Sequence, residues 1–322
     1  MQSPTFNEAL RFWLKLGFIS FGGPAGQISI MHEELVTRRK WVDEQHFKDG
    51  LSFCTLLPGP EAQQLATYLG WYLHGIKGGI LAGLLFILPS IFILLGLSLA
   101  YVTYGDHPAA YEVLFFLRPA VLAIIVTAFM KMAEKSLQEH KHFLAAFSSF
   151  VLMTFFAVPF TVIIFSALIA GWIFAGNTQV TDVNAVRYEP ATARSKFPLI
   201  AGSGFVLWLL PMVAVVVLNK DFDFWSHFSM FFTKAACVTF GGAYAVLPYV
   251  ADKAVNEFGW LSTTQMVDGL ALGETTPGPL IMVLAFVGFM AGYNVSGGST
   301  WVGTAALFAT VWYTFLPGFV FV

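Results

Sequence analysis

Charged residues are scarce in this sequence. Asp, Glu, Lys and Arg make up 11% of its 322 residues, whereas a soluble domain contains about a quarter. Hydrophobic residues make up 57%, and the mean hydropathy is +0.71. The formal net charge of −2 and the lack of a polybasic tail argue against nucleic acid as a partner. We therefore expect a lipid bilayer, and not water, to surround most of the chain.

Cysteine is also rare. Cys54 and Cys237 cannot form a disulfide framework, and no Cys/His cluster has the spacing of metal ligands. We interpret both as packed apolar side chains and expect no metal and no cofactor. The sequence has no nucleotide-binding Gly-rich loop, so ATP is not expected to drive its function directly. Met1 to Leu10 lack the basic flank and short apolar core of a cleaved signal peptide.

Long apolar runs are what the sequence has in excess. Several reach the ~20 residues that cross a hydrocarbon core. We predict spans at about 78–104, 110–132, 143–157, 160–175 and 198–218, with a turn at Pro159. Backbone groups in lipid must be satisfied within each segment, which leaves helices as the economical choice. The predicted fold class is an all-α polytopic membrane protein.

The sequence contains an internal repeat at a constant offset of 219 residues. The matching pairs are Phe21-Gly22-Gly23 with Phe240-Gly241-Gly242, Trp41 with Trp260, Asp49-Gly50-Leu51 with Asp268-Gly269-Leu270, and Pro58-Gly59-Pro60 with Pro277-Gly278-Pro279. Lys15 and Lys234 keep the same offset, as do Phe12 and Phe231. One register held over roughly fifty residues indicates a duplicated unit. We divide the chain into a first repeat with extra spans, 1–218, and a second repeat, 219–322.

The two copies are predicted to have inverted topology, because five predicted spans separate them. The basic residues of the loops then collect on one face, as the positive-inside rule requires of the cytoplasm; they are Arg38-Arg39-Lys40, Lys77, Lys135 to Lys141, Arg187, Arg194 and Lys196. The second copy has Glu257-Phe258-Gly259 where the first has the basic triplet. If 143–175 were one tilted helix, the copies would instead be parallel.

The second copy looks shorter than the first. The first continues for about 130 residues beyond Leu88-Pro89, whereas the chain stops at Val322, soon after the similar Leu316-Pro317. We interpret this as a truncated second repeat, with a natural short form as the alternative.

The repeated motifs are helix breakers inside apolar sequence. Proline removes a backbone donor and glycine frees the backbone, so such breaks create helix ends at membrane depth. Breaks at corresponding positions of two repeats point to the substrate site of a transporter, and a helix N-terminus suits an anion. The candidate substrate-binding residues are Gly22, Gly23, Pro58, Gly59, Pro60, Gly241, Gly242, Pro277, Gly278 and Pro279. The plainer alternative is that these residues only allow kinks and close helix packing.

Two pairs of charged residues lie near the breaks. Lys15 and Lys234 each precede a Phe-Gly-Gly motif by six residues; they either neutralise an oxyanion at the site or extend to the membrane surface. Glu61 directly follows the first Pro-Gly-Pro motif and Glu274 precedes the second by three residues. An ionisable residue at membrane depth is a functional candidate, so this pair could couple protons to transport, or merely cap helices.

Asp49 and Asp268 also keep the register, each before Gly-Leu. Two such carboxylates raise the hypothesis of an intramembrane aspartyl protease, but neither has the Gly-x-Gly-Asp setting of those enzymes. We therefore expect no enzyme, and assign the pair to packing or helix capping.

The doubled motif set resembles the long, two-repeat form of the chromate ion transporter family. The residues that carry the resemblance are Phe21-Gly22-Gly23-Pro24, Leu57-Pro58-Gly59-Pro60, Phe240-Gly241-Gly242 and Thr276-Pro277-Gly278-Pro279. The resemblance implies chromate export across the cytoplasmic (inner) membrane, and hence chromate resistance, by oppositely oriented halves. Sulfate is the alternative substrate, because it shares the charge and tetrahedral shape of chromate. A passive anion channel and a non-transporting subunit are the alternative functions, and a homodimer is one candidate assembly.

Overall fold

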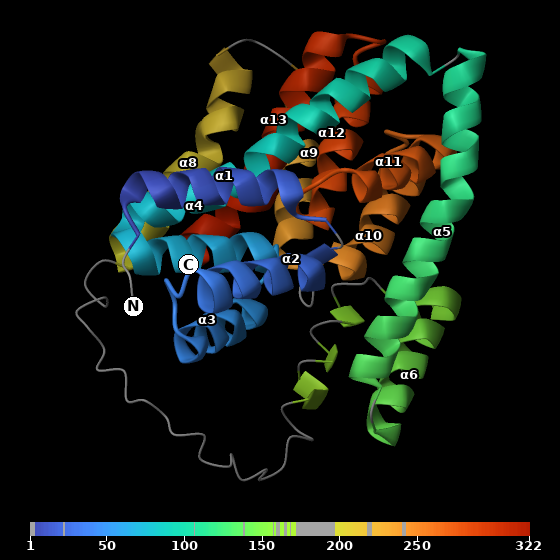
Figure 1. Cartoon of the computed structure of the whole chain (residues 1–322). Helices are drawn as coiled ribbons and strands as arrows, with labels where there is room; N and C mark the ends of the chain where they lie inside the picture. The colour runs from blue at the N-terminus through green and yellow to red at the C-terminus, as the bar shows by residue number, and fades with distance from the viewer. Residues whose placement is uncertain are drawn as a thin grey trace. The chain divides into compact units, whose positions relative to one another are not determined.

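The computed structural model describes residues 4–21, 23–105, 107–137, 139–156, 158, 162–163, 166–167, 169–171, 197–217, 221–239 and 243–322 (Figure 1). Every regular element in these ranges is a helix, which confirms the all-α prediction. The chain forms two compact units, residues 1–124 with 204–322, and residues 125–203. Both sets of repeated motifs belong to the first unit.

Two series of helices build the first unit. The first copy supplies α1 (Phe6–Ile19), α2 (Gly23–His32), η1 (Glu33–Arg38), α3 (Glu44–Leu56), α4 (Glu61–Tyr104) and the beginning of α5 (Pro108–Ser136). The second copy supplies α9 (Phe222–Cys237), α10 (Ala243–Asp252), η3 (Lys253–Glu257), α11 (Thr263–Thr275), η4 (Leu280–Met282), α12 (Val283–Val295) and α13 (Thr300–Phe321), preceded by most of α8 (Phe197–Val217).

The second unit contains the rest of α5 and α6 (His140–Phe156). Helices α5, α6 and α8 match the spans predicted at 110–132, 143–157 and 198–218. The predicted turn at Pro159 and most of the span at 160–175 lie outside the described residues. The odd number of crossings, on which the inverted topology depends, therefore stays a prediction.

Helix α4 is a helical hairpin and not a straight rod. Its backbone leaves the helical region at His74 and Gly75, where Gly75 has φ of +63°. Beyond this break the chain folds back, so that a Cβ added to Gly79 would lie 3.0 Å from the carbonyl oxygen of Thr67. Glycines, which have no side chain, let the two halves of α4 approach closely. The prediction at 78–104 thus found the second half of α4 and missed the first.

The second copy repeats this hairpin with two separate helices. Helices α12 and α13 lie side by side (Figure 1), joined by a turn in which Gly297 and Gly298 have positive φ. A Cβ on Gly292 would lie 2.6 Å from the Cβ of Ala306, so small residues again set the helix spacing. The repeat therefore extends beyond the motifs into α4 and the α12–α13 pair.

The register of 219 residues also holds in the backbone between the motifs. Each copy has a short π-helix at the same place, η1 in the first copy and η3 in the second. The amide of Trp41 donates to Leu35 O and that of Trp260 to Ala254 O, both at 2.8 Å. The next helix of each copy is capped at equivalent positions by Asp43 and Ser262. These matches confirm the internal repeat as a structural one.

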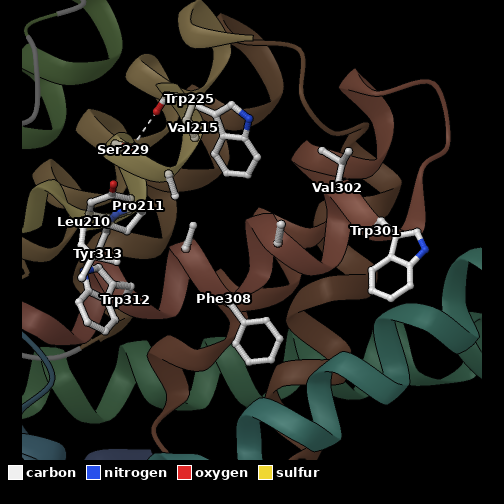
Figure 2. Close-up of a pocket in the computed structure, with 13 residues that line it drawn as sticks. Leu210, Pro211, Val215, Trp225, Ser229, Trp301, Val302, Phe308, Trp312 and Tyr313 are labelled. Atoms are coloured by element: carbon white, nitrogen blue, oxygen red, sulfur yellow. Dashed lines mark hydrogen bonds between the residues drawn. The ribbon is translucent and has the colours of Figure 1, made fainter. Parts of the chain in front are cut away.

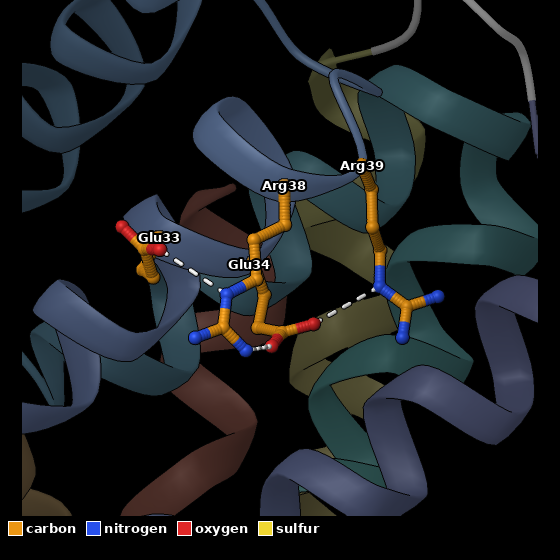
Figure 3. Close-up of polar contacts among 4 residues, drawn as sticks. All are labelled: Glu33, Glu34, Arg38 and Arg39. Atoms are coloured by element: carbon orange, nitrogen blue, oxygen red, sulfur yellow. Dashed lines mark hydrogen bonds and ion pairs between the residues drawn. The ribbon is translucent and has the colours of Figure 1, made fainter.

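Two residues of the basic triplet, Arg38 and Arg39, form an ion-pair network with glutamates of η1 (Figure 3). Arg38 binds Glu33 and Glu34 at 3.1 and 3.0 Å, and Arg39 binds Glu34 at 3.1 Å. The guanidinium of Arg39 also lies 4.8 Å from the ring centre of Trp41. The third residue, Lys40, has φ of +53°, where the second copy has Gly259 at +60°.

Two helices in the described part of the chain are long and apolar enough to cross a membrane. They are α4 and α13, and residues 202–217 and 280–295 form shorter apolar helices. Many large apolar side chains on these helices are exposed, among them Phe92 and Trp301. Exposed apolar surface of this extent needs a non-aqueous environment.

Candidate functional site

The two broken segments of one copy are hydrogen-bonded to those of the other. The Gly59 amide, in the first Pro-Gly-Pro motif, donates to Thr239 O at 2.8 Å, and the Gly278 amide, in the second, donates to Ser20 O at 2.7 Å. Ser20 and Thr239 are equivalent positions at the ends of α1 and α9, just before the Phe-Gly-Gly motifs. The exchange is reciprocal, because each copy donates one of the two hydrogen bonds and accepts the other. We call this the crossing.

Side chains bind the remaining carbonyls of the crossing. Gln27 Nε2 donates to Gly278 O, Gln64 Nε2 donates to Pro58 O at 2.8 Å, and Ser90 Oγ donates to Pro277 O. Gln27 and Ser90 belong to the first copy and bind the loop of the second, so they tie the copies together. Sequence analysis did not identify these three residues, because a neutral polar side chain in an apolar helix has no motif of its own.

Glycine is required at the centre of both loops. Gly59 has φ of +125° and Gly278 of +104°, conformations that side chains rarely adopt. A Cβ on Gly278 would overlap the hydroxyl of Ser90, and one on Gly59 would lie 2.8 Å from Gln64 Nε2. Gly278 thus serves a close approach between the two copies, whereas Gly59 lies close to a side chain of its own copy.

The crossing is lined by buried polar atoms without a partner among the described residues. They are Ser20 Oγ and the side-chain carbonyl oxygens of Gln27 and Gln64, and all three residues are 0% exposed. Buried polar atoms normally bind something, and each that does not needs an explanation. A polar ligand or water at the crossing would satisfy them.

The predicted motif residues lie where helices end and begin. Helix α3 ends at Leu56 and α4 begins at Glu61, and α11 ends at Thr275 before η4 begins at Leu280. The Pro-Gly-Pro motifs fill these two gaps, as predicted. Gly23 begins α2 with φ of +70°. Gly22, Gly241 and Gly242 lie outside the described residues.

The two register-equivalent lysines occupy exposed positions. Lys15 is on the outer face of α1 and Lys234 on that of α9, while their neighbours Leu16 and Ala235 are buried at 0% exposure. The symmetry predicted for the pair is present in the helices that carry it. Whether either lysine binds substrate stays a prediction.

The two glutamates have different surroundings. Glu61 is the first residue of α4, after the N-cap Pro60. Glu274 lies in the last turn of α11 and accepts a hydrogen bond from the Tyr244 hydroxyl at 3.0 Å. Its partner is thus a side chain of α10 and not a helix end, which argues against a capping role for Glu274.

Asp268 forms a buried ion pair that the sequence did not predict. Its carboxylate accepts hydrogen bonds from Arg118 Nε at 2.7 Å, from Arg118 Nη2 at 3.1 Å and from the Tyr101 hydroxyl at 3.0 Å. The side chains of Asp268 and Arg118 are 2% and 25% exposed. Asp49, the equivalent residue, accepts from Gln45 at 2.8 Å. Both aspartates lie within helices, so the capping role expected for them is wrong.

One cavity of the first unit is apolar. It has a volume of about 440 Å³ and lies between α8, α9 and α13, with Trp225, Trp301, Phe308, Trp312 and Tyr313 on its walls (Figure 2). The Ser229 hydroxyl donates to Trp225 O at 2.7 Å. No charged residue lines this cavity, so it does not suit an inorganic anion.

Comparison with known proteins matches the chain to one family over most of its length. The chromate transporter family model matches residues 7–172 and 226–322. A chromate transport protein of Cupriavidus metallidurans is 31% identical over 291 residues, which cover 89% of this chain and 68% of that protein. A chromate transport protein of Pseudomonas aeruginosa is 30% identical over 320 residues, covering 96% and 70%.

An archaeal relative extends the comparison. A transporter of Methanocaldococcus jannaschii is 27% identical over 291 residues, covering 90% of this chain and 70% of that protein. No solved structure matches the chain. The family model matches both halves of the chain, and the helix breaks that meet at the crossing occur once in each half. This membrane protein therefore belongs to the chromate transporter family.

Proposed function

We propose that this chain carries a tetrahedral oxyanion, chromate in the first place, out of the cell across the cytoplasmic membrane. The family and its two relatives named chromate transport proteins support the substrate. The crossing is the observation that carries the site, because it brings the broken helices of both copies together around buried polar atoms. Chromate resistance would follow from export.

The anion would bind beside the crossing and not on its glycine amides. The amides of Gly59 and Gly278 already donate to carbonyls of the opposite copy. Helix α4, however, begins immediately after the first loop, at Glu61, and the first turn of a helix presents N–H groups and about half a positive charge. Glu61 would disfavour an anion there while ionised, which is why we retain it, with Glu274, as a coupling candidate.

The copies would work as inverted repeats that expose the site to alternate sides. The loop charges support this topology, because the basic triplet Arg38-Arg39-Lys40 of the first copy has no equivalent in the second, which has Glu257-Phe258-Gly259. In transporters of this architecture one repeat moves against the other around a fixed midplane site. The driving force would be the membrane potential, worth about 2.3 kcal/mol per charge per 100 mV, or a proton gradient.

The test is radiolabelled chromate flux into everted membrane vesicles that contain the full chain. Uptake that depends on the gradient and falls with excess sulfate is the expected result, and would mean that both dianions share one site. A passive channel would instead give flux far above carrier rates without countertransport. If the vesicles take up no chromate, transport by this chain alone is refuted. The remaining hypothesis is then a subunit that needs a partner.

A further inference from the structure

A polar pocket surrounds the buried ion pair of Asp268 and Arg118. Its volume is about 310 Å³, enough for a small oxyanion with several waters, since one water occupies about 30 Å³. The pocket lies where α4, α5, α11 and α12 meet, in the first unit, and its polar lining consists of Tyr101, Arg118, Thr264, Gln265, Asp268 and Tyr293. It is separate from the crossing, which follows the other end of α11.

The geometry of the pair is that of an occupied oxyanion site. Arg118 donates through Nε and Nη2 to the two oxygens of one carboxylate, the two-point contact that a guanidinium makes equally well with two oxygens of a tetrahedral anion. In the structure the Asp268 carboxylate occupies the place beside Arg118 that an anion would take. An incoming oxyanion would find a planar, permanently charged donor already oriented by its surroundings.

We propose that this pocket binds a tetrahedral oxyanion, which takes the place of the Asp268 carboxylate on Arg118 while Asp268 takes up one proton. The inference rests on the proposed transport function and adds to it a site and a coupling step. The one covalent change is the new O–H bond of Asp268, whose proton comes from solvent. The anion gains two hydrogen bonds from Arg118, and the carboxylate loses them.

Charge explains why the proton is needed. With Asp268 ionised, a bound dianion, Arg118 and Asp268 would together carry two negative charges in a buried place. Protonation reduces this to one. Among the described residues that line the pocket, the other ionisable groups are the guanidinium of Arg118 and the phenols of Tyr101 and Tyr293. Asp268 is the one carboxylate there, so it is the group that takes up the proton.

Binding should therefore weaken as the pH rises. Sulfate is the appropriate probe, because it stays a dianion between about pH 6 and 8, so that any pH dependence comes from the protein. We expect the affinity of the purified full chain for radiolabelled sulfate to fall by up to about tenfold per pH unit. Asp268→Asn should remove this dependence and bind at least as tightly as the wild type at the lowest pH.

The repeat supplies a matched control. Asp49→Asn makes the same change at the equivalent position of the first copy, where the carboxylate accepts a hydrogen bond from Gln45, and should keep the wild-type affinity and pH dependence. Arg118→Gln should lose sulfate binding. The proposal is overturned if Asp268→Asn keeps the wild-type pH dependence, or if Arg118→Gln binds sulfate as the wild type does.

A milder change at Arg118 keeps the test valid if Arg118→Gln fails to fold. Arg118→Lys keeps the charge but loses the two-point contact, and should weaken sulfate binding several-fold; unchanged affinity would also overturn the proposal. Chromate flux in vesicles separates the two hypotheses. If the wild type transports and all three pocket variants transport equally, only this site fails, whereas a wild type without flux refutes the proposed function and leaves the binding assay to decide the pocket.

Discussion

Replacing Gly278 by alanine should destabilise the protein far more than a typical glycine-to-alanine change in a helix. The φ of +104° lies in a region that is essentially restricted to glycine, and a side chain there costs about 1–3 kcal/mol. The new Cβ would also overlap the Ser90 hydroxyl. Moving Ser90 breaks its hydrogen bond to Pro277 O, and leaving that buried carbonyl without a partner costs about 1–3 kcal/mol. We expect a total loss of about 2–6 kcal/mol.

Two glycines of the same chain provide controls. Gly59→Ala has the same kind of backbone strain but meets the flexible Gln64 side chain, so its cost should stay near the strain alone, about 1–3 kcal/mol. Gly96 lies within α4 with nothing within 4 Å of its added Cβ, so Gly96→Ala should be neutral or gain up to about 1 kcal/mol. The predicted order of destabilisation is Gly278, Gly59, Gly96.

The double variant Gly278→Ala, Ser90→Ala tests the mechanism. Both single changes lose the same hydrogen bond, so the loss in the double variant should be about 1–3 kcal/mol smaller than the sum of the single losses. Unfolding can be followed with a thiol-reactive dye that labels Cys54, which is buried as expected. Cys237 is exposed, so the packed position expected for it is wrong, and a Cys237→Ser background removes its thiol. Equal stability of the Gly278→Ala and Gly96→Ala proteins would refute the description of the crossing.

Further predictions concern the lysines. Lys15→Ala and Lys234→Ala should abolish chromate transport while membrane insertion stays intact; normal flux in both variants would remove these lysines from the site. Lys40→Gly should stabilise the chain by up to about 1 kcal/mol, because it relieves a left-handed conformation. The reverse exchange, Gly259→Ala, should cost about 1 kcal/mol, since space is open around the added Cβ. Thermal unfolding of the purified variants checks both, and equal midpoints would contradict the strain assigned to Lys40.

The helix breaks could be predicted from the sequence because proline and glycine act locally. A Pro-Gly-Pro motif interrupts a helix wherever it lies, so the gaps between α3 and α4 and between α11 and η4 follow from the residues alone. The register of the repeat was equally visible. The contacts of the broken segments, however, depend on the opposite copy within the same chain. Hence Gln27 and Ser90, which bind the opposite loop, could not be identified.

The first half of α4 was missed for a related reason. It contains Gln63, Gln64 and Thr67, which lower its hydropathy, yet all three are buried. Their polar groups are hidden against other helices and not exposed to lipid, so hydropathy underestimates the membrane depth of the segment. Arg118 carried a usable signal, a cation within the apolar run at 110–132. Its partner Asp268 is 150 residues away, and no local pattern could pair them.

The crossing must open if one copy moves against the other, and its energetics allow this. Two backbone hydrogen bonds and the two side-chain hydrogen bonds of Gln27 and Ser90 hold the loops together, and each contributes about 0.5–1.5 kcal/mol net. Their sum is comparable with the work that a membrane potential performs on one or two charges. The bonds at Gly59 and Gly278 are reciprocal, so a rigid movement of one copy breaks both together. Stronger ties would hold the copies in a single state.

Amide hydrogen exchange can test this coupling in the purified chain. Peptides that contain Gly59 and Gly278 should exchange at similar rates, and saturating sulfate should change both rates in the same direction and by a similar factor. The reason is that a common opening exposes both amides to solvent. A peptide from α12, which is almost fully buried, serves as the internal control and should exchange more slowly. If sulfate alters exchange at one glycine and not at the other, the loops open independently, and the crossing cannot be the element that links the two copies during transport.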